Sequence, residues 1–228
     1  MPDVKNAAIV IDNELRVPGD VFSLEKFRDW AHSPDFPPSG WISYIAGEIE
    51  VEMSPEEIQT HNKVKISLGG GMLVWVEKRE LGEVLGDRAF LVNEVADLAT
   101  EPDLIFVSWK SLRSGRVRYA ERKKGSKRYV EVVGSPDLVV EVVSDGSVRK
   151  DTVLLRERYW RAGIPEYWLV DARGEEVIFR LLCRKARGYA EAAPDAKGYR
   201  RSAVLGGWFS LTRRRNPVGG WAYKLLAR

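Results

Sequence analysis

The sequence predicts a mixed α/β (α+β) fold, in which a mixed central sheet is flanked by helices and followed by an antiparallel β extension. The first observation is a strand–helix–strand pattern over residues 135–171, which has the length that a parallel crossover requires. The second is a meander of short apolar segments over 175–225, punctuated by glycines and prolines and without a helical period. We expect one domain over residues 1–228, with its core at about 20–180 and the β extension at 181–228.

The N-terminal part of the chain predicts a strand, a short helix and a hairpin. Residues 7–17 alternate loosely between apolar and polar side chains, which indicates a strand. Ser23 is a suitable N-cap for a helix over 24–31, because its hydroxyl can accept a bond from a backbone N–H. Residues 41–45 and 48–53 flank an Ala-Gly turn and are expected to pair as a hairpin, with three acids along one face of the second strand.

A longer helix is expected next. It begins at Ser54-Pro55-Glu56-Glu57, where proline and acids suit the positive end of a helix, and its apolar pattern runs to Trp75. Gly69-Gly70-Gly71 interrupts the helix-forming sequence, so we expect either a kink or a helix carried by its packing. His61 falls early in this helix, where a single histidine is more often a surface or core residue than a catalytic one.

Two Pro-Asp-Leu sequences each open an apolar segment. After a strand pair predicted within 82–92, the first opens the strand at 99–107 and contains Asp103. The second opens the strand at 135–143 and contains Asp137. The repeated Pro-Asp-Leu sequence suggests two similar central strands whose N-terminal ends carry acids. Alternatively, the aspartate only forms a turn by accepting bonds from backbone N–H groups.

Glu141 lies within the apolar run 138–143. Because side chains alternate along a strand, Glu141 shares one face with Asp137 and Val139. A nearly continuous apolar run suggests a strand covered on both sides, where an unpaired carboxylate is costly. Glu141 should therefore be paired, coordinate a metal, or face a cleft. A structural ion pair with an arginine of the following helix, 148–162, stays open as an alternative.

The composition is that of an ordinary globular protein, with 44% hydrophobic and 30% charged residues. One cysteine, Cys183, excludes an intramolecular disulfide and fits a reducing compartment, so we expect a cytoplasmic location. There is no secretory signal pattern and no run of 18 apolar residues, so no membrane partner is expected. The net charge of +3 is too small to indicate a polyanionic partner by itself.

The basic residues are unevenly distributed. Nine lysines and arginines lie between Lys110 and Arg128 against one acid, Glu121. Such a cluster could contact phosphates, or it could form a solvated loop. A smaller basic run, 213–215, is interpreted as ordinary surface. The residues proposed for nucleic-acid binding are Arg116, Arg118, Arg122, Lys123, Lys124, Lys127 and Arg128.

Several sequence blocks carry a resemblance to a known family. They are GEIEVEMSP at 47–55, Thr60-His61-Asn62, EPDLIFV at 101–107, SPDLVVEVVS at 135–144, RKD at 149–151 and YWRAGIPEYWLVD at 159–171. In this order and spacing the chain resembles the Uma-two family of restriction endonucleases, which belongs to the PD-(D/E)XK nuclease superfamily. The resemblance implies a restriction-endonuclease-like fold that binds a divalent metal and cuts phosphodiesters.

The resemblance also implies roles for particular residues. Asp103 and Glu141 match the acids of two family motifs and are the expected ligands of Mg²⁺ or Mn²⁺. Glu48 matches a further family carboxylate, and His61 is expected to assist substrate contact or proton transfer. DNA is the expected nucleic acid, and a homodimer is an assembly that analogy with double-strand nucleases suggests.

One position departs from the family pattern. The superfamily lysine would follow Glu141 by two residues, where this chain has Val143. In the Uma-two relatives the lysine lies four residues after the Arg-Asp acid, where this chain has Leu155. Lys150, beside Asp151, is the candidate that remains, and its ammonium group could orient the attacking water.

Three hypotheses follow from the sequence. The first is a metal-dependent endonuclease with catalytic residues Glu48, His61, Asp103, Glu141 and Lys150. The second is a catalytically impaired nuclease-like module that binds nucleic acid through residues 110–128. The third is a protein-interaction or structural domain whose acids are ion-paired. Convergence of the carboxylates on one metal-sized hollow would separate the first hypothesis from the third.

Overall fold

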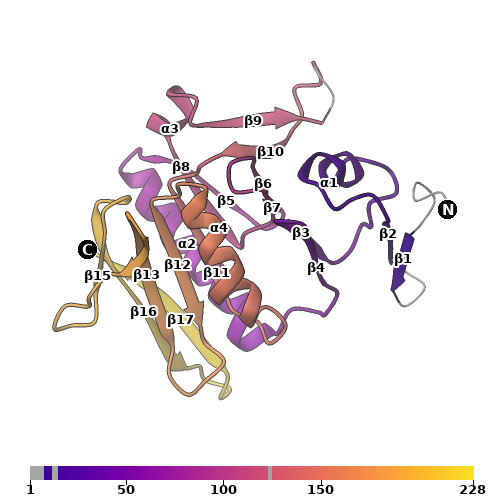
Figure 1. Cartoon of the computed structure of the whole chain (residues 1–228). Coiled ribbons are helices and arrows are strands. Elements are labelled where there is room, and N and C mark those ends of the chain that lie inside the picture. Colours follow the sequence, from indigo (N-terminus) through magenta and orange to yellow (C-terminus); the bar gives the residue numbers. More distant parts are fainter. Residues whose placement is uncertain (1–7, 12–14, 123–124) are drawn as a thin grey trace.

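The computed structural model describes residues 8–11, 15–122 and 125–228, and it confirms the mixed α/β class (Figure 1). One six-stranded sheet has the spatial order β4 (Glu48–Glu52), β3 (Trp41–Ile45), β7 (Leu98–Thr100), β6 (Phe90–Asn93), β10 (Tyr129–Gly134) and β9 (Val117–Glu121). The other six-stranded sheet, the central sheet, has the order β14 (Gly188–Glu191), β13 (Ile178–Lys185), β12 (Glu166–Asp171), β11 (Leu138–Val142), β8 (Leu104–Ser108) and β5 (Gly82–Gly86).

Smaller elements surround these two sheets. The remaining strands are the N-terminal pair β1 (Ala8–Ile11) and β2 (Leu15–Pro18) and the C-terminal sheet β15 (Arg200–Ser202), β16 (Gly207–Arg215) and β17 (Trp221–Ala227). The helices are α1 (Leu24–Ala31), α2 (Lys63–Lys78), α3 (Trp109–Arg113) and α4 (Leu155–Arg161). Two π-helical turns, η2 (Ile58–Asn62) and η3 (Lys150–Leu154), precede α2 and α4. No helix among the described residues is long and apolar enough to cross a membrane.

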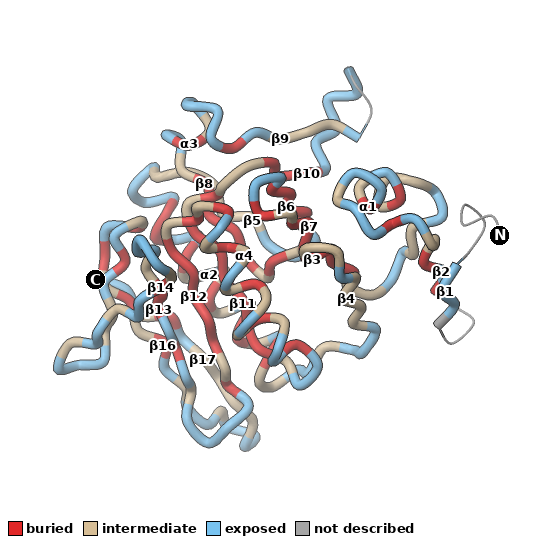
Figure 2. Tube along the Cα trace, in the orientation of Figure 1, coloured by how far each residue is buried: buried red, intermediate tan, exposed pale blue. Residues whose placement is uncertain are grey.

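The predicted strand–helix–strand unit is confirmed. β11 and β12 are parallel neighbours, with Leu138 opposite Glu166 and Val142 opposite Val170, and η3 and α4 form the crossover between them. Both strands are almost entirely buried (Figure 2), as the nearly continuous apolar sequence indicates.

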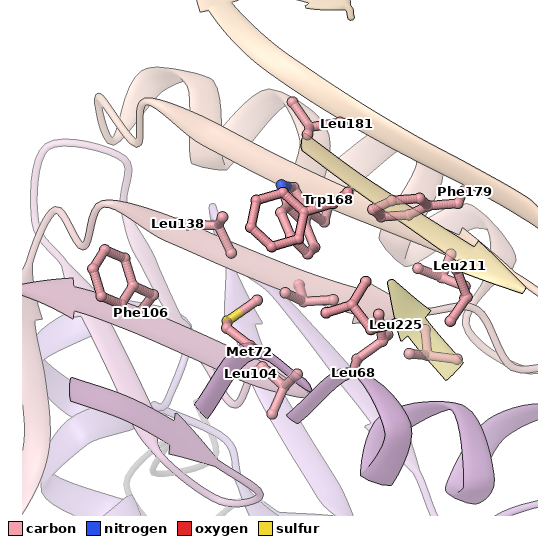
Figure 3. Packing of buried hydrophobic residues seen from close by; sticks show 14 of the residues in the cluster. Leu68, Met72, Leu104, Phe106, Leu138, Trp168, Phe179, Leu181, Leu211 and Leu225 are labelled. Atoms are coloured by element: carbon pink, nitrogen blue, oxygen red, sulfur yellow. The ribbon is translucent and has the colours of Figure 1, made fainter. Parts of the chain in front are cut away.

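The central sheet is covered on both faces because its strands carry apolar side chains on alternate positions. Leu138, Val140 and Val142 pack on one face with α2 and the C-terminal hairpin (Figure 3). Val139 and Val143 face the opposite side, in a cluster that includes Leu155 and Tyr159. Glu141 has the parity of this second face and is therefore directed towards the α4 side.

The triple-glycine segment of α2 does not break the helix, so packing decides between the two alternatives predicted there. A Cβ atom at Gly71 would lie 2.8 Å from the Cβ of Leu225, and one at Gly69 would lie 3.3 Å from Leu104. These glycines let β17 and β8 approach the helix closely, which offsets their cost in helix propensity. The regular helix begins later than predicted, because Glu57 accepts the N–H groups of Gln59 and Thr60 and the chain first makes a π-helical turn.

Three local predictions differ from the structure. The predicted strand at 7–17 is an antiparallel pair whose connecting residues 12–14 lie outside the described part of the chain. The predicted pair within 82–92 is wrong, because β5 pairs with β8 whereas β6 pairs with β7 and β10. All four residues of β6 are buried, so this strand requires the interior of a sheet. The C-terminal meander only partly extends the central sheet, since β13 and β14 join it but β15–β17 form a separate sheet.

Candidate active site

An acidic cleft of about 260 Å³ lies where β11 ends and β8 begins. Its walls come from the end of β4, the start of the α2 segment, the residue stretch before β8, and the loop and π-helical turn that follow β11. The titratable groups in these walls that carry the argument below are Glu52, Glu56, His61, Glu101, Asp103, Glu141, Lys150 and Asp151.

Asp103 and Glu141 converge in this cleft because β8 and β11 are antiparallel. Val140 lies opposite Leu104, so the next pair in this register places Asp103 opposite Glu141. Directly opposite residues of an antiparallel pair point to the same face of the sheet. Asp103 is fixed further by the backbone N–H of Val142, which donates to its Oδ2 at 2.6 Å. Burial raises the pKa of Asp103, although His61 and Lys65 oppose that effect.

Glu141 is only 4% exposed, and its Oε1 accepts a hydrogen bond from the Tyr159 hydroxyl at 2.5 Å. Burial raises the pKa of Glu141 well above its ordinary value, and the neighbouring Asp151 and Asp103 raise it further. Within the described part of the chain, no arginine forms an ion pair with Glu141, so the alternative of a structural pair with the following helix is wrong. Glu141 instead faces neighbouring carboxylates that disfavour its charged form.

The loop after β11 directs two more charged groups into the cleft. Ser147 donates its hydroxyl to Asp151 Oδ2 and accepts the Asp151 N–H at its carbonyl, which fixes the start of η3. Asp151 Oδ1 is buried and has no hydrogen-bond partner among the described residues. Burial, with the nearby carboxylates of Asp103 and Glu52, raises the pKa of Asp151 to about 7 despite the opposing effect of Lys150.

Lys150 is the main cation on this side of the cleft. Its Nζ lies 3.9 Å from Glu52 Oε2 and 3.9 Å from Asp151 Oδ1, and 17% of its side chain is exposed. Burial lowers the pKa of Lys150, but the surrounding carboxylates outweigh this and raise it above the ordinary value. Lys150 therefore stays charged and only partly offsets the acids around it.

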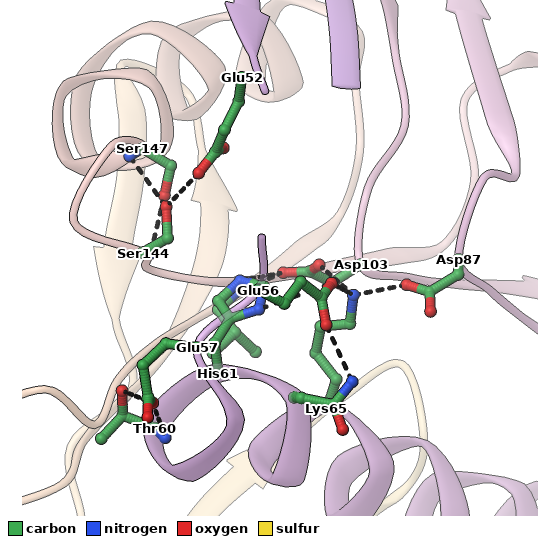
Figure 4. Close-up of polar contacts among 12 residues, drawn as sticks. Glu52, Glu56, Glu57, Thr60, His61, Lys65, Asp87, Asp103, Ser144 and Ser147 are labelled. Carbon is green, nitrogen blue, oxygen red and sulfur yellow. Dashed lines mark hydrogen bonds and ion pairs between the residues drawn. The ribbon is translucent and has the colours of Figure 1, made fainter. Parts of the chain in front are cut away.

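The opposite wall is a second network on the α2 segment (Figure 4). His61 Nε2 lies 3.9 Å from Asp103 Oδ2, and its Nδ1 lies 3.7 Å from Glu56 Oε1. One turn later, the buried Lys65 Nζ contacts Glu56, Asp87 at 2.6 Å and Asp103 at 3.4 Å. Its carboxylate partners raise the pKa of Lys65 against the effect of burial, so this lysine is a fixed charge that positions Asp103.

Both π-helical turns border the cleft. η2 contains His61, and η3 contains Lys150 and Asp151. A π-helical turn adds a residue to a helical turn and is frequent at functional sites, because it redirects side chains that a regular helix would place elsewhere.

The structure brings four of the five predicted catalytic residues to this cleft and leaves the fifth outside. His61, Asp103, Glu141 and Lys150 line the cavity, whereas Glu48 does not. Glu48 lies at the beginning of β4, its side chain is 57% exposed, and it contacts Arg149 at 3.6 Å. Glu52, at the other end of β4, reaches the cleft and accepts the Ser144 hydroxyl at 2.8 Å.

The basic cluster predicted to bind nucleic acid lies elsewhere. Arg116 donates to the carbonyls of Ser135 and Pro136, which precede β11, whereas the cleft follows β11. Arg122 donates to the carbonyl of His32. Arg118 is in β9, and Lys127 and Arg128 lie between β9 and β10. Lys123 and Lys124 lie outside the described residues.

Sequence reasoning missed several residues of the cleft. Glu52 shares a strand face with Glu48, so alternation alone could not choose between them. Asp151 is in the Arg-Lys-Asp block that carried the resemblance, but no role was assigned to it. Lys65 could have been found from its position four residues after His61, since i and i+4 side chains share a helix face. Glu101 opens the sequence block 101–107, but no role was assigned to it, and burial raises its pKa.

The donor set partly fits a divalent cation. Its carboxylate oxygens are the hard ligands that Mg²⁺ and Mn²⁺ prefer, and the buried Asp151 Oδ1 accepts no hydrogen bond within the described part of the chain. In the described part of the chain, however, no three acid, histidine or cysteine groups are gathered into a ready metal cluster. Mg²⁺ commonly uses one or two carboxylates and keeps several waters, so two converging carboxylates are compatible with it.

The sheet arrangement and the cleft define the class of protein as a restriction-endonuclease-like α/β protein, and a solved structure supports this. The crystal structure of "a putative nuclease belonging to DUF820" from Anabaena variabilis is similar to this chain, with a TM-score of 0.56 and 16% identity. The similarity covers 81% of this chain and 90% of that chain. At this identity the likeness establishes the fold alone. No curated protein matches the chain.

The family is established by a second comparison. The Uma2 family, described as "Putative restriction endonuclease", matches residues 24–212. Because this match covers most of the chain, the protein belongs to the Uma2 family. This confirms the resemblance drawn from the sequence blocks, and it supports nuclease function in general.

Proposed function

We propose that this protein is a metal-dependent endonuclease that hydrolyses phosphodiester bonds of nucleic acid, with DNA as the substrate. One observation carries the proposal. Asp103 and Glu141, from adjacent antiparallel strands, share one face of the central sheet and border one cavity. The crowding of buried carboxylates around them favours a bound cation, because burial and the repulsion from Asp151 and Asp103 together raise the pKa of Glu141.

Asp103 and Glu141 would hold the cation, and Asp151, whose buried Oδ1 accepts no hydrogen bond from the described residues, would be the third acid of the set. A divalent cation held there would supply charge neutralisation at the phosphate and activation of a water. Tyr159 orients Glu141 by donating its hydroxyl, and Lys65 orients Asp103 through its contact at 3.4 Å. These two side chains act as positioning residues for the acids.

Lys150 and His61 would act on the reacting groups. The Lys150 ammonium lies inside the cleft and can orient an attacking water or balance charge that develops on the phosphate. His61 lines the other wall, and its buried Nδ1 has no hydrogen-bond partner among the described residues. Because its other nitrogen, Nε2, lies 3.9 Å from Asp103 Oδ2, the ring is placed to contact substrate or to transfer a proton beside Asp103.

A supercoiled-plasmid cleavage assay with Mg²⁺ or Mn²⁺ tests this proposal. Glu141→Gln and Asp103→Asn each keep the size of the side chain and remove its charge, and we expect each to lower the cleavage rate roughly 10²–10³-fold. Glu166→Gln is the matched control. Glu166 is also a buried glutamate, on the neighbouring strand β12, but it lies at the opposite end and accepts the Trp168 indole N–H.

The proposal fails if Glu141→Gln, Asp103→Asn and the wild-type protein cleave at equal rates, since the activity would then come from another site or a contaminant. It also fails if purified wild-type protein does not cleave with either metal.

A second candidate function is a nuclease-like module that binds nucleic acid without cutting it. The observation that favours it is Leu155, which stands where the Uma-two relatives have a lysine. Leu155 is fully buried in the hydrophobic cluster on the α4 side, so this position supplies no cation to the cleft. DNA binding without cleavage by the wild-type protein in Mg²⁺ and Mn²⁺ would favour this function over the endonuclease.

A further inference from the structure

The C-terminal end of the chain is strongly basic, in contrast to the rest. Residues 200–228 contain no aspartate or glutamate, so all 33 acids of the chain precede this segment. The remaining residues hold 29 of the 36 lysines and arginines and are therefore acidic overall. The seven cations of the segment are Arg200, Arg201, Arg213, Arg214, Arg215, Lys224 and Arg228.

The hairpin of β16 and β17 lies along α2 with one face inward. Phe209, Leu211 and Leu225 belong to the buried cluster that includes Leu68 and Met72 of α2. Side chains alternate along a strand, so Arg213 and Arg215 continue the inward face beyond these apolar residues. Arg214, between them, belongs to the outer face.

The end of this hairpin is attached to the helical segment whose other side forms a wall of the cleft. Gln59 Oε1 accepts the backbone N–H of Trp221 at 2.9 Å, and Lys63 Nζ donates to the carbonyl of Trp221 at 3.2 Å. Gln59 and Lys63 each lie two residues from His61 in the helical segment that forms one wall of the cleft, so they leave this segment on a different side from His61 and do not line the cleft itself. The strand end with Arg215, which is paired with Trp221, is therefore next to that wall.

The two inward arginines are held in place without neutralisation by an acid. Their guanidinium carbons lie 4.0 Å (Arg213) and 3.5 Å (Arg215) from the centre of the Trp221 ring. Arg213 also donates to the carbonyls of Ala172 and Gly174, each at 3.0 Å, and Arg215 donates to the carbonyl of Gly219 at 2.8 Å. Among the ion pairs of the described residues, none joins either arginine to a carboxylate.

We infer that this basic hairpin end, formed by Arg213, Arg215 and Trp221 together with Lys63, binds the phosphate backbone of DNA beside the cleft. The inference rests on the proposed function, in which DNA enters the cleft. An acid-lined cleft repels a polyanion, so a substrate needs cations next to it, and phosphate contacts fix its position on the protein. Arg215, which is exposed, supplies a charged group whose orientation Trp221 fixes.

The cluster at 110–128 is less well placed for this role. Arg116 is bound to residues that precede β11, so the length of that strand separates it from the cleft, roughly 17 Å at about 3.3 Å per residue. Figure 1 shows α3 and β9 at one end of the molecule and the turn between β16 and β17 at the other.

Binding of a fluorescent DNA duplex to the full chain in EDTA, measured over a series of NaCl concentrations, tests the inference. EDTA separates binding from cleavage. Arg215→Gln should weaken binding and lower the slope of log K against log salt by about 0.9, the value for one lost phosphate contact. Arg215→Lys keeps the charge and should keep most of the slope. Arg214→Gln, which removes the same charge from the adjacent residue on the outer face, should leave the slope unchanged.

Three results would overturn the inference: no salt-dependent binding by the wild-type protein, equal effects of Arg215→Gln and Arg214→Gln, or loss of slope only in Arg118→Gln/Arg128→Gln, which would transfer binding to the other cluster. A parallel cleavage assay keeps the two proposals apart. If the protein cleaves DNA but Arg215→Gln does not change the salt slope, the proposed hairpin site is rejected and the proposed nuclease activity is retained. If Arg215→Gln changes the salt slope but the protein does not cleave DNA, the hairpin site is retained and the nuclease activity is rejected.

Discussion

Glu131 and Glu141 lie ten residues apart on strands of the two six-stranded sheets, and each is only 4% exposed, yet their surroundings are opposite. Arg28 donates to both Glu131 oxygens, at 3.0 and 2.6 Å, and His32 Nε2 lies 2.8 Å from Oε1. Although burial raises it, these partners lower the pKa of Glu131 to about 2. Glu141 accepts a bond from the neutral Tyr159 hydroxyl, and burial together with Asp151 and Asp103 raises its pKa against the smaller opposing effect of Lys150.

The difference shows that burial of an acid does not identify a functional site, whereas its partners do. A carboxylate that receives a bidentate arginine is satisfied and serves the fold. A carboxylate surrounded by other carboxylates has an electrostatic cost that the fold alone does not offset, and such sites are candidates for cation binding or proton transfer. Glu141 is of the second kind and Glu131 of the first.

The largest effect that sharpens this comparison concerns Lys150, the lysine near the buried acids around Glu141. We expect Lys150→Met to lower the cleavage rate about 100-fold, because it removes the ammonium group that lies 3.9 Å from both Glu52 and Asp151. Plasmid cleavage under single-turnover conditions measures this loss. Lys185→Met, at the exposed last residue of β13, is the control. Cleavage by Lys150→Met at the wild-type rate would show that Lys150 has no catalytic role.

A smaller effect concerns Glu131, the acid that is paired with an arginine. Glu131→Gln should lower the free energy of unfolding at pH 7 by about 2 kcal/mol, because it breaks a charge-assisted contact with Arg28 and His32. The folded pKa is below the unfolded value, so this stabilisation is present above about pH 4.5 and is lost as the pH falls towards about 2. Urea unfolding at decreasing pH should show the difference from the wild type shrinking. A constant difference would mean that packing, not charge, explains the contribution of Glu131.

The smallest expected effect has the opposite sign. The folded pKa of Glu141 is raised, so its contribution favours the folded state at low pH and is lost as the pH rises. In EDTA at pH 8, Glu141→Gln should therefore raise the free energy of unfolding by about 1 kcal/mol, although with Mg²⁺ it lowers the cleavage rate roughly 10²–10³-fold. Urea unfolding of Glu141→Gln and Glu131→Gln in parallel measures whether each substitution raises or lowers the free energy of unfolding. Destabilisation by Glu141→Gln at pH 8 would break the comparison.

Much of the central sheet could be predicted from local sequence. The apolar run with one acid, the helix and the following strand at 135–171 fixed the parallel crossover and drew attention to Glu141, because periodicity and length are local properties. The relation between β8 and β11 could not be predicted. Both open with Pro-Asp-Leu, but the strands are antiparallel, so Asp103 enters the cleft while Asp137 accepts the Ser108 N–H and the Ser111 hydroxyl at the opposite end.

The rest of the candidate site depended on tertiary placement. Alternation put Glu48, Glu50 and Glu52 on one strand face, but only the position of the β4 end beside the Ser144 loop selects Glu52 for the cleft. Likewise, the density of basic residues favoured 110–128 in the sequence, whereas the structure places the shorter run at 213–215 beside the cleft wall. Charge density is visible in a sequence, but proximity to a cleft is not.

Isothermal titration with Mn²⁺ at pH 8 tests the central claim most directly, that the acids around Glu141 form a cation site and the acid at Glu131 does not. The account predicts that the wild-type protein and Glu131→Gln bind Mn²⁺ with similar affinity. Glu141→Gln should bind at least roughly tenfold more weakly, as expected for the loss of one charged ligand. Equal Mn²⁺ affinity in all three proteins, or no binding by the wild type, would contradict it.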